Sequence, residues 1–351
     1  MPPGVNVLRN QGDLVGEIQT SSNSMPPEGS AREMATPRTV VSKGAEVAVI
    51  IAAFNSGRFL DQALASLAVQ TLPPSSVVVA DDCSDDDTSD RARGWVGRLP
   101  VTVVRLECNS GPGLARDRAI RATHAPLLAM LDADDFFLPD HLETMVRTYA
   151  DCPGLVSAQE LAWYPGTGLR LPTQRRRLGR RDTQLTALLR GNFVNFGFFS
   201  RDLYKAAGGF GAQYFCEDWD LWIRMLRTGA QLTMAGHPTA LHRVHPGSLS
   251  FDSARMAQHA VSYLNAALRG AQSPAEAAAV RSGIAALTAK LSFFEAMDLA
   301  ARGERQQARR VACAALPASG FRASAGLLAA ALAPSAAARL EQARRVRAPG
   351  R

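Results

Sequence analysis

Three carboxylates follow the apolar run L-L-A-M-L of residues 127–131, at Asp132, Asp134 and Asp135. An apolar run of this length is typical of a strand that is buried on both faces of a parallel sheet. The carboxylates would then lie at the carboxyl end of a central strand, where open α/β sheets bind ligands. Carboxylates crowded at a strand end favour a divalent cation, Mg²⁺ or Mn²⁺, that is shared with a phosphate. The alternative is a solvated acidic turn.

Polar residues also end two other predicted strands. Asn55 follows the apolar run V-A-V-I-I-A-A, and the pair Asp81 and Asp82 follows V-V-V-A. Parallel strands end at the same edge of a sheet, so these side chains are expected to converge with the carboxylates after residue 131. Buried like charges cost stability unless they are compensated, so folding needs alone explain this pattern poorly. The sequence therefore predicts a ligand site at this edge.

A third acidic group, Glu217, Asp218 and Asp220, opens a predicted helix over residues 217–226. Carboxylates here could do acid–base chemistry on a substrate. Acids in a first turn also favour the helix dipole, so a purely capping role is the competing interpretation.

The apolar periodicity predicts alternating strands and helices in an α/β fold with a mostly parallel, Rossmann-like sheet flanked by helices. Pro139 and Asp140 are expected to open a helix, since proline suits the first turn. The predicted elements before that point are strands at 47–53, 77–80, 101–106 and 127–131 and helices at 60–70, 88–96 and 114–123. Beyond it, strands are predicted at 155–163 and 193–199 and a turn at 208–210.

The domain boundaries are predicted from composition. Residues 1–44 lack periodicity and are expected to form a disordered leader, and residues 45–251 are expected to form the α/β domain. From Ser253, alanine, leucine and arginine at helical spacing predict a C-terminal bundle of about four helices within 252–351, with Ser273, Pro274 and Glu276 as a capping box.

The chain's charge is concentrated at one end. Its 351 residues carry a formal charge of +7, but the last 51 residues hold ten Arg and two Glu, so the rest sums to −1. The body is therefore not a basic nucleic-acid-binding surface. The five cysteines form no C-x-x-C pair, which suits a reducing, cytoplasmic location. No apolar run approaches the ~20 residues of a membrane span, and the N-terminus lacks a signal pattern.

Taken together, four sequence blocks make residues 47–250 resemble the family-two glycosyltransferases of the GT-A fold. The blocks are the strand ending A-A-F-N; V-V-A-D-D-C-S-D-D-D-T; G-P-G-L-A-R-D-R-A followed by L-D-A-D-D; and G-G-F with E-D-W-D-L-W-I-R-M, followed by H-R-V-H-P-G-S-L-S. Such enzymes move a sugar from a nucleoside diphosphate to an acceptor hydroxyl. The resemblance implies Mn²⁺ or Mg²⁺ as cofactor and a nucleotide-sugar donor as partner.

The resemblance assigns the donor side residue by residue. Phe54 is implied to lie against the base, and Asp82 to accept a hydrogen bond from the base imide, which favours uracil or thymine. Asp132 corresponds to the ribose-binding member of the D-x-D motif and Asp134 to its metal ligand. Arg116 matches a basic residue near the nucleotide, although a surface ion pair with Asp117 fits the sequence equally. Ala53, Asn55 and Ala133 complete the implied nucleotide-binding set.

The resemblance assigns the acceptor side to the E-D pair. Asp218 corresponds to the general base of an inverting transfer, and Glu217 is implied to hold acceptor hydroxyls. Trp219 is expected to line the acceptor site and Trp222 to lie in the core. His245 is implied to contact the metal or diphosphate, with a structural role as the alternative.

The predicted function is an inverting, metal-dependent glycosyltransferase that moves a sugar from a nucleoside-diphosphate sugar, with a UDP-sugar favoured, to an acceptor hydroxyl. The acceptor is expected to be a glycan or lipid-linked molecule in cell-surface polysaccharide, glycolipid or glycoconjugate synthesis. One alternative is a catalytically inactive sugar-nucleotide-binding scaffold. Another is a nucleotidyltransferase, for which A-A-F-N-S-G-R (residues 52–58) is a poor phosphate loop. Arginines at 175–177, 180 and 181 and in the C-terminal tail suggest peripheral contact with the inner face of a membrane, or merely solvated segments.

Overall fold

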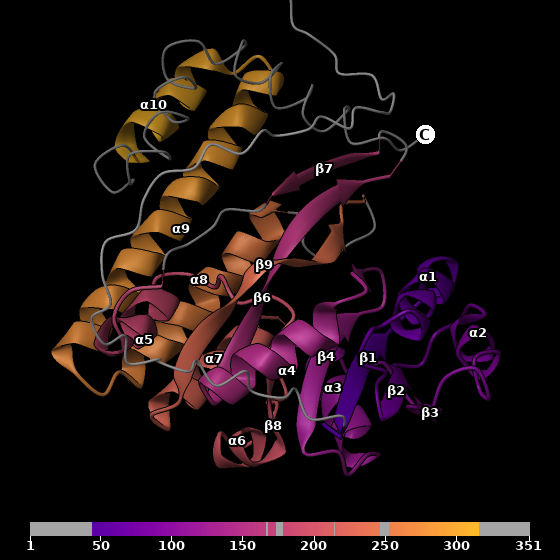
Figure 1. Cartoon of the computed structure of the whole chain (residues 1–351). Coiled ribbons are helices and arrows are strands. Elements are labelled where there is room, and N and C mark those ends of the chain that lie inside the picture. Colours follow the sequence, from indigo (N-terminus) through magenta and orange to yellow (C-terminus); the bar gives the residue numbers. More distant parts are fainter. Residues whose placement is uncertain (1–43, 166–167, 173–177, 214, 246–252, 316–351) are drawn as a thin grey trace, which may run out of the picture. The chain divides into compact units, whose positions relative to one another are not determined.

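The computed structural model describes residues 44–165, 168–172, 178–213, 215–245 and 253–315 (Figure 1). The predicted leader, except Gly44, and the basic tail after residue 315 lie outside these residues. So do three arginines of the 175–181 cluster and the P-G-S-L-S segment at 246–250.

The first half is the predicted alternation of strands and helices. Its elements are β1 (Val47–Ala53), α1 (Gly57–Ala68), β2 (Ser76–Asp81), α2 (Thr88–Arg93), β3 (Val101–Arg105), α3 (Pro112–Arg121) and β4 (Leu127–Asp132). These four strands are parallel in the order β3-β2-β1-β4, with Ile51 level with Val79 on one side and Leu131 on the other. The carboxyl ends of β1, β2 and β4 therefore meet at one edge, as the sequence predicted.

The second half extends this sheet with strands of both directions. Its elements are β5 (Phe136–Phe137), α4 (His141–Asp151), β6 (Gly154–Tyr164), β7 (Leu169–Pro172), α5 (Arg181–Leu189), β8 (Phe198–Ser200), α6 (Arg201–Ala206), α7 (Glu217–Arg227) and β9 (Gln231–Arg243). The full order is β3-β2-β1-β4-β8-β6-β9-β5, with β7 paired to β6. β8 is antiparallel to β4, whereas β6 and β9 are parallel to each other.

Two predicted boundaries in this half are wrong. The helix after β4 begins at His141 with Asp140 as its N-cap, so Pro139 lies outside it, and the short strand β5 comes first. The strand predicted at 193–199 is reduced to Phe198–Ser200, because residues 193–197 run as a loop that lines the functional cavity.

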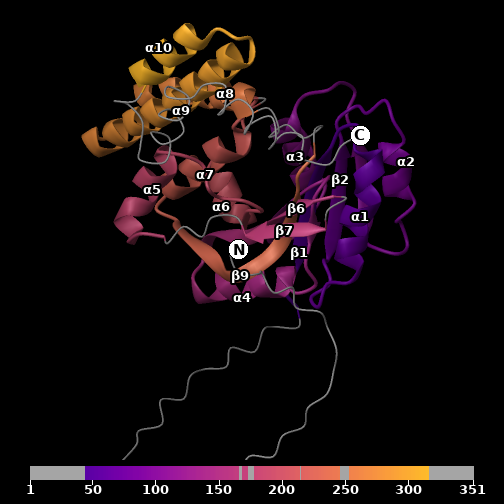
Figure 2. The same cartoon turned by 90° about the horizontal axis from the view of Figure 1, so that it is seen from above.

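The sheet is covered by helices on both faces (Figures 1 and 2). Side chains of β1 alternate: Ala48 and Ile50 join the core that α3 and α7 share, and Val49 joins the core of α1 and α4. This alternation is the two-residue period of a strand. Because both faces are buried, β1 is apolar throughout, which is the pattern that made the strand recognisable from the sequence.

Three C-terminal helices follow within the described residues: α8 (Ser253–Arg269), α9 (Pro274–Ala301) and α10 (Arg305–Ala315). The Ser273 side chain accepts a hydrogen bond from the Glu276 N–H at 3.2 Å, as the predicted capping box requires, but Glu276 Oε2 accepts the N–H of Gln272 rather than that of Ser273. Leu264 of α8 and Val280 of α9 belong to the same core as α7. None of the helices in the described part of the chain is long and apolar enough to cross a membrane.

Candidate active site

A cavity of about 500 Å³ opens at the carboxyl ends of β1, β2 and β4. Eleven residues that the resemblance assigned to nucleotide, metal or catalysis come from six separate segments, yet all of them line this cavity. They are Ala53, Phe54, Asn55, Asp82, Arg116, Asp132, Ala133, Asp134, Glu217, Asp218 and His245. The predicted convergence is therefore present, while the role of each residue remains a prediction.

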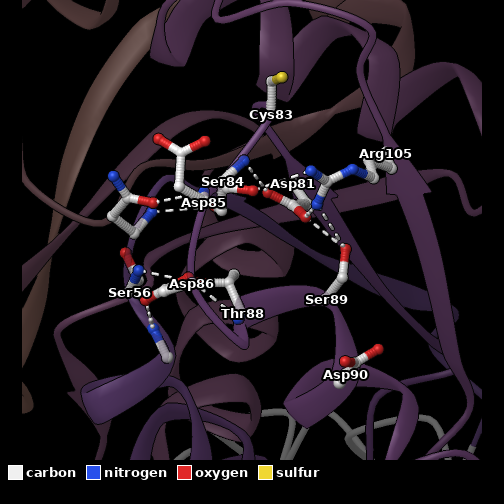
Figure 3. Close-up of polar contacts among 12 residues, drawn as sticks. Ser56, Asp81, Cys83, Ser84, Asp85, Asp86, Thr88, Ser89, Asp90 and Arg105 are labelled. Carbon is white, nitrogen blue, oxygen red and sulfur yellow. Dashed lines mark hydrogen bonds and ion pairs between the residues drawn. The ribbon is translucent and has the colours of Figure 1, made fainter.

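The loops after β1 and β2 are tied together by the acidic block of residues 81–88 (Figure 3). The Asn55 N–H donates to Ser84 Oγ at 2.9 Å, and the Asp85 N–H donates back to Asn55 Oδ1 at 2.8 Å. Asp86 accepts the Gly57 N–H at 3.0 Å, which fixes the start of α1. Asn55 itself has a positive φ of 48°, a conformation that asparagine tolerates. These bonds hold the loop that presents Phe54, 42% exposed, to the cavity.

The two aspartates at the end of β2 have different environments. Asp81 is fully buried and accepts hydrogen bonds from Arg105 at 2.6 Å and from Ser89 (Figure 3). It does not line the cavity, so the expectation that the pair converges there is correct for Asp82 alone. The Asp82 carboxylate accepts the N–H groups of Ser110 and Gly111, each at 2.8 Å. Asp82 is thereby locked in place on the cavity wall.

Arg116 joins two walls of the cavity. Its guanidinium contacts Glu217 Oε1 and Asp132 Oδ1, each at 2.6 Å, and its side chain is 11% exposed. The alternative of a surface pair with Asp117 is wrong, because Asp117 pairs with Arg121 at 2.7 Å instead. The guanidinium therefore offsets the repulsion between carboxylates from β4 and α7.

The start of α7 directs two carboxylates into the cavity. Burial raises the pKa of Glu217 to about 7, even though Arg116 opposes the shift. Burial also raises the pKa of Asp218, whose Oδ2 accepts a hydrogen bond from Asn192 Nδ2 at 3.0 Å. Acids placed only to cap a helix would be solvated. Their burial in the cavity therefore favours the chemical role over the capping role.

Backbone geometry makes this placement possible. Cys216, which precedes α7, has a left-handed φ of 60°, a costly conformation for a residue with a Cβ. Gly113 lies against Glu217, and a Cβ at Gly113 would come within 3.0 Å of Glu217 Cβ and 3.2 Å of the Gly211 carbonyl. Glycine at 113 thus lets α3 and α7 approach each other closely enough for Arg116 to reach Glu217.

Asp134 and His245 form the part of the cavity that could hold a metal ion. Asp134 Oδ2 lies 2.9 Å from His245 Nε2. Burial acts to raise the pKa of Asp134, but the hydrogen bond and charge of His245 outweigh it and lower the pKa, which keeps the carboxylate ionised. No cluster of three or more such ligands occurs among the described residues. The pair therefore fits an ion that takes its remaining ligands from phosphate and water, as Mg²⁺ usually does.

Asp135, which the sequence named only as one of three clustered carboxylates, positions this pair together with His242 and Arg243, to which the sequence reasoning gave no role. Asp135 is buried and accepts the Arg243 N–H at 2.7 Å, and it lies 3.1 Å from His242 Nδ1. Arg243 Nε also donates to the Asp134 carbonyl at 2.7 Å. Burial lowers the pKa of His242, but its bond to Asp135 and the nearby acids outweigh this and raise the pKa to about 9. The H-R-V-H block gave no signal for these contacts, because the two-residue period of a strand places the side chains of His242 and Arg243 on opposite faces.

Of the two expectations for the tryptophans of α7, that for Trp219 is wrong and that for Trp222 is confirmed. Trp219 is 4% exposed and its indole N–H donates to the Leu188 carbonyl at 2.8 Å, so it belongs to the core. Trp222 is 2% exposed and belongs to the same core, and its ring also borders the cavity, against Gly197.

Comparisons with known proteins agree with this geometry. A family model described as "Glycosyl transferase family 2" matches residues 48–206. The amylovoran biosynthesis glycosyltransferase AmsE of Erwinia amylovora is 30% identical over 210 residues, which cover 57% of this chain and 76% of AmsE. The chain belongs to glycosyltransferase family 2. The match spans 58% of the length of the succinoglycan biosynthesis protein ExoU and 47% of that of ExoO, both of Rhizobium meliloti.

Solved structures share the fold of this family-two chain. TarS 1–349 of S. aureus, in complex with UDP-GlcNAc, has a TM-score of 0.54 at 17% identity, and the match covers 86% of this chain and 91% of TarS. The mannosyltransferase PcManGT of Pyrobaculum calidifontis, in complex with GDP-Man and Mn²⁺, has a TM-score of 0.54 at 19% identity, covering 86% and 88%. At these identities the likeness establishes the fold alone.

Proposed function

We propose that this family-two chain is an inverting, metal-dependent glycosyltransferase that moves a sugar from a UDP-sugar to an acceptor hydroxyl. The observation that carries the proposal is one cavity that holds the half-buried Asp218 carboxylate together with the Asp134–His245 pair. A base and a diphosphate-binding side are the two parts that such a transfer needs.

The base is assigned to Asp218. As the acceptor oxygen attacks the anomeric carbon, the hydroxyl proton passes to the Asp218 carboxylate and the bond from that carbon to the diphosphate oxygen breaks. The raised pKa of Asp218 suits this step, because a base accepts a proton more readily as its pKa approaches the working pH. The Asn192 side-chain amide and the backbone N–H of Trp219 both donate to the Asp218 carboxylate and hold it in one orientation. Glu217, paired to Arg116, is placed to accept hydrogen bonds from acceptor hydroxyls.

The donor is assigned to the β1, β2 and β4 ends. Exposed Phe54 offers a ring face for the base, Asp82 an acceptor for an imide N–H, and Asp132 an acceptor for ribose hydroxyls. Each Asp82 oxygen already accepts one backbone N–H and has a lone pair left for a base. The UDP-GlcNAc complex of TarS is consistent with uracil, and the GDP-Man complex of PcManGT makes guanine the alternative to test.

Mn²⁺ or Mg²⁺ is proposed as the cofactor, held by Asp134 and His245. When bound, the ion neutralises charge on the leaving diphosphate. The donor set of one carboxylate and one imidazole suits Mn²⁺ at least as well as Mg²⁺. The Mn²⁺ in the PcManGT complex supports this assignment.

The acceptor is proposed to be a glycan or lipid-linked hydroxyl in the synthesis of a surface polysaccharide or glycoconjugate. AmsE is named as an amylovoran biosynthesis glycosyltransferase, which supports a biosynthetic role for the transfer. Peripheral membrane contact through the arginine-rich segments is kept as part of the proposal. Arg180 and Arg181 are exposed, and the other arginines concerned lie outside the described residues.

Calorimetric titration of UDP, with and without Mn²⁺, tests this function together with the D218N variant. We expect Mn²⁺ to tighten UDP binding, and D218N to leave binding unchanged while lowering sugar transfer by about 10²–10⁴-fold. Loss of UDP binding in D218N would refute the assignment of the base. Intact binding without transfer in the wild type, across donor sugars, would favour the inactive scaffold, and release of pyrophosphate would favour a nucleotidyltransferase.

A further inference from the structure

The cavity carries far more negative than positive charge. Seven carboxylates and two arginines line it. The carboxylates are those of Asp82, Asp132, Asp134, Asp135, Glu160, Glu217 and Asp218. A nucleoside diphosphate brings further negative charge, so the cavity must supply cations to hold it.

Most of the positive charge in the cavity is already engaged. Arg116 places one guanidinium nitrogen against Glu217 and the other against Asp132, each at 2.6 Å. The charge on His242 is matched by Asp135 at 3.1 Å. Neither group can compensate a phosphate without giving up a carboxylate that would then repel it.

Arg58 is the exception. It belongs to the first turn of α1 and is exposed at the cavity wall. Among the residues that the structure describes, no carboxylate lies within ion-pair distance of Arg58. Its guanidinium makes a cation–π contact with the ring of Phe59, whose centroid lies 4.4 Å from the guanidinium carbon. Arg58 is therefore the arginine of the cavity that remains available for an anion.

The position of Arg58 indicates which anion it meets. The Phe59 ring that carries Arg58 also contacts His245, with ring centroids 4.5 Å apart, and His245 lies 2.9 Å from Asp134. Arg58 thus borders the proposed metal-binding pair, where the diphosphate is expected. The positive end of the α1 dipole adds to the same side.

We propose that Arg58 binds the β-phosphate of the donor and stabilises the charge that develops on this leaving group. This inference rests on the proposed function and names the protein cation that the reaction uses beside its metal ion. As the bond from the anomeric carbon to the β-phosphate oxygen breaks, the bonding electrons pass to that oxygen. The Arg58 guanidinium donates to it with two parallel N–H groups, a geometry that lysine cannot reproduce.

The test compares UDP with UMP, which lacks the β-phosphate. We expect R58A to weaken UDP binding about tenfold at low salt, at the lower end for a charge-assisted hydrogen bond because the site is exposed, and to leave UMP binding unchanged. R58K should recover part of the loss. With donor at saturation, R58A should also lower kcat, because the contact strengthens as charge develops.

Arg98 provides the matched control. It is also an exposed arginine on an aromatic ring, 3.9 Å from the Trp95 centroid, but it does not line the cavity. R98A should therefore bind UDP as the wild type does. Equal UDP binding by wild type and R58A, or an equal loss of UMP binding in R58A, would overturn the assignment of Arg58 alone. Failure of the wild type to bind UDP, GDP and dTDP would instead overturn the proposed function and this inference with it.

Discussion

Replacing Arg116 with Met removes the guanidinium between Glu217 and Asp132 and keeps most of the side-chain volume. Breaking a buried ion pair by removing one partner costs about 3–5 kcal/mol when the remaining charge cannot escape. In this site both carboxylates can avoid remaining charged and buried. The Asp132 side chain is 51% exposed and recovers hydration, and Glu217, at 10%, can take up a proton. The cost of R116M should therefore depend on pH.

The size of this dependence follows from the pKa of Glu217, which is about 7 with Arg116 present and rises further without it. In the unfolded chain the pKa of Glu217 is lower, about 4.3. The protonated Glu217 therefore stabilises the folded protein at low pH, and this contribution is lost as the pH rises through the folded pKa. For each pH unit above 7 at which Glu217 of the variant stays protonated, the free energy of unfolding of R116M falls by at most about 1.4 kcal/mol relative to the wild type. The deficit of R116M should be small at pH 6 and reach about 2–3 kcal/mol at pH 9.

Urea unfolding of the wild type and R116M at pH 6 and pH 9 measures this deficit. The control is the same comparison in an E217Q background, where no carboxyl remains at 217 to titrate. There the cost of R116M should change less with pH, because only Asp218, whose pKa Arg116 also lowers, still titrates beside the lost guanidinium. An equal deficit at both pH values, or a pH dependence that is undiminished in the E217Q background, would show that the bridge to Glu217 is not the source.

Three further predictions concern the parts that hold the site. G113A should separate α3 from α7, because its Cβ would lie 3.0 Å from the Cβ of Glu217. We expect the free energy of unfolding in urea to fall by about 1–3 kcal/mol, and kcat to fall by a larger fraction than stability does. Unchanged kinetics would contradict the close approach of the two helices. D86A should cost about 1–3 kcal/mol and weaken nucleotide binding in calorimetry, because it leaves a part-buried N–H at the start of α1 unpaired; full nucleotide affinity would count against the loop's role. N192A should raise the pKa of Asp218 further, because it removes a hydrogen bond to the carboxylate. Since transfer needs the ionised carboxylate, the transfer rate should begin to fall at a higher pH on acidification, while UDP affinity stays constant. An unshifted acidic side of the pH–rate profile would argue against Asp218 as the base.

The first half of the fold was predictable because its strands are buried on both faces. A continuous apolar run such as V-A-V-I-I-A-A admits few other interpretations when turn residues and a helical pattern follow. The second half was less readable. The strand β9, which begins at Gln231 and carries His242, mixes polar and apolar residues because part of it lies at the surface and part lines the cavity. Tertiary contacts rather than local propensity decide such a segment.

The site was predictable where chemistry left a mark in the residue types. Asp132 and Asp134 follow a continuous apolar run and Asp218 opens a helix, so residue type and place along the chain were enough to name them as candidates. Positioning residues leave no such mark. Asn192 reached its place because a loop 26 residues before Asp218 folds back onto α7, and Arg243 did so through the pairing of β9 with β6. Only the three-dimensional pairing reveals these contacts.

The core shared between α7 and the C-terminal helices has a consequence for engineering. Tyr263 of α8 packs on Trp219 with ring centroids 5.5 Å apart, and Gly283 of α9 lies against the Leu189 carbonyl at the end of α5, where a Cβ would come within 3.0 Å. A protein cut at residue 251 would expose the back of the helix that carries Asp218 to water. Hybrid enzymes that exchange acceptor specificity by grafting should therefore transfer α7, α8 and α9 as one block, with the seam placed before α5.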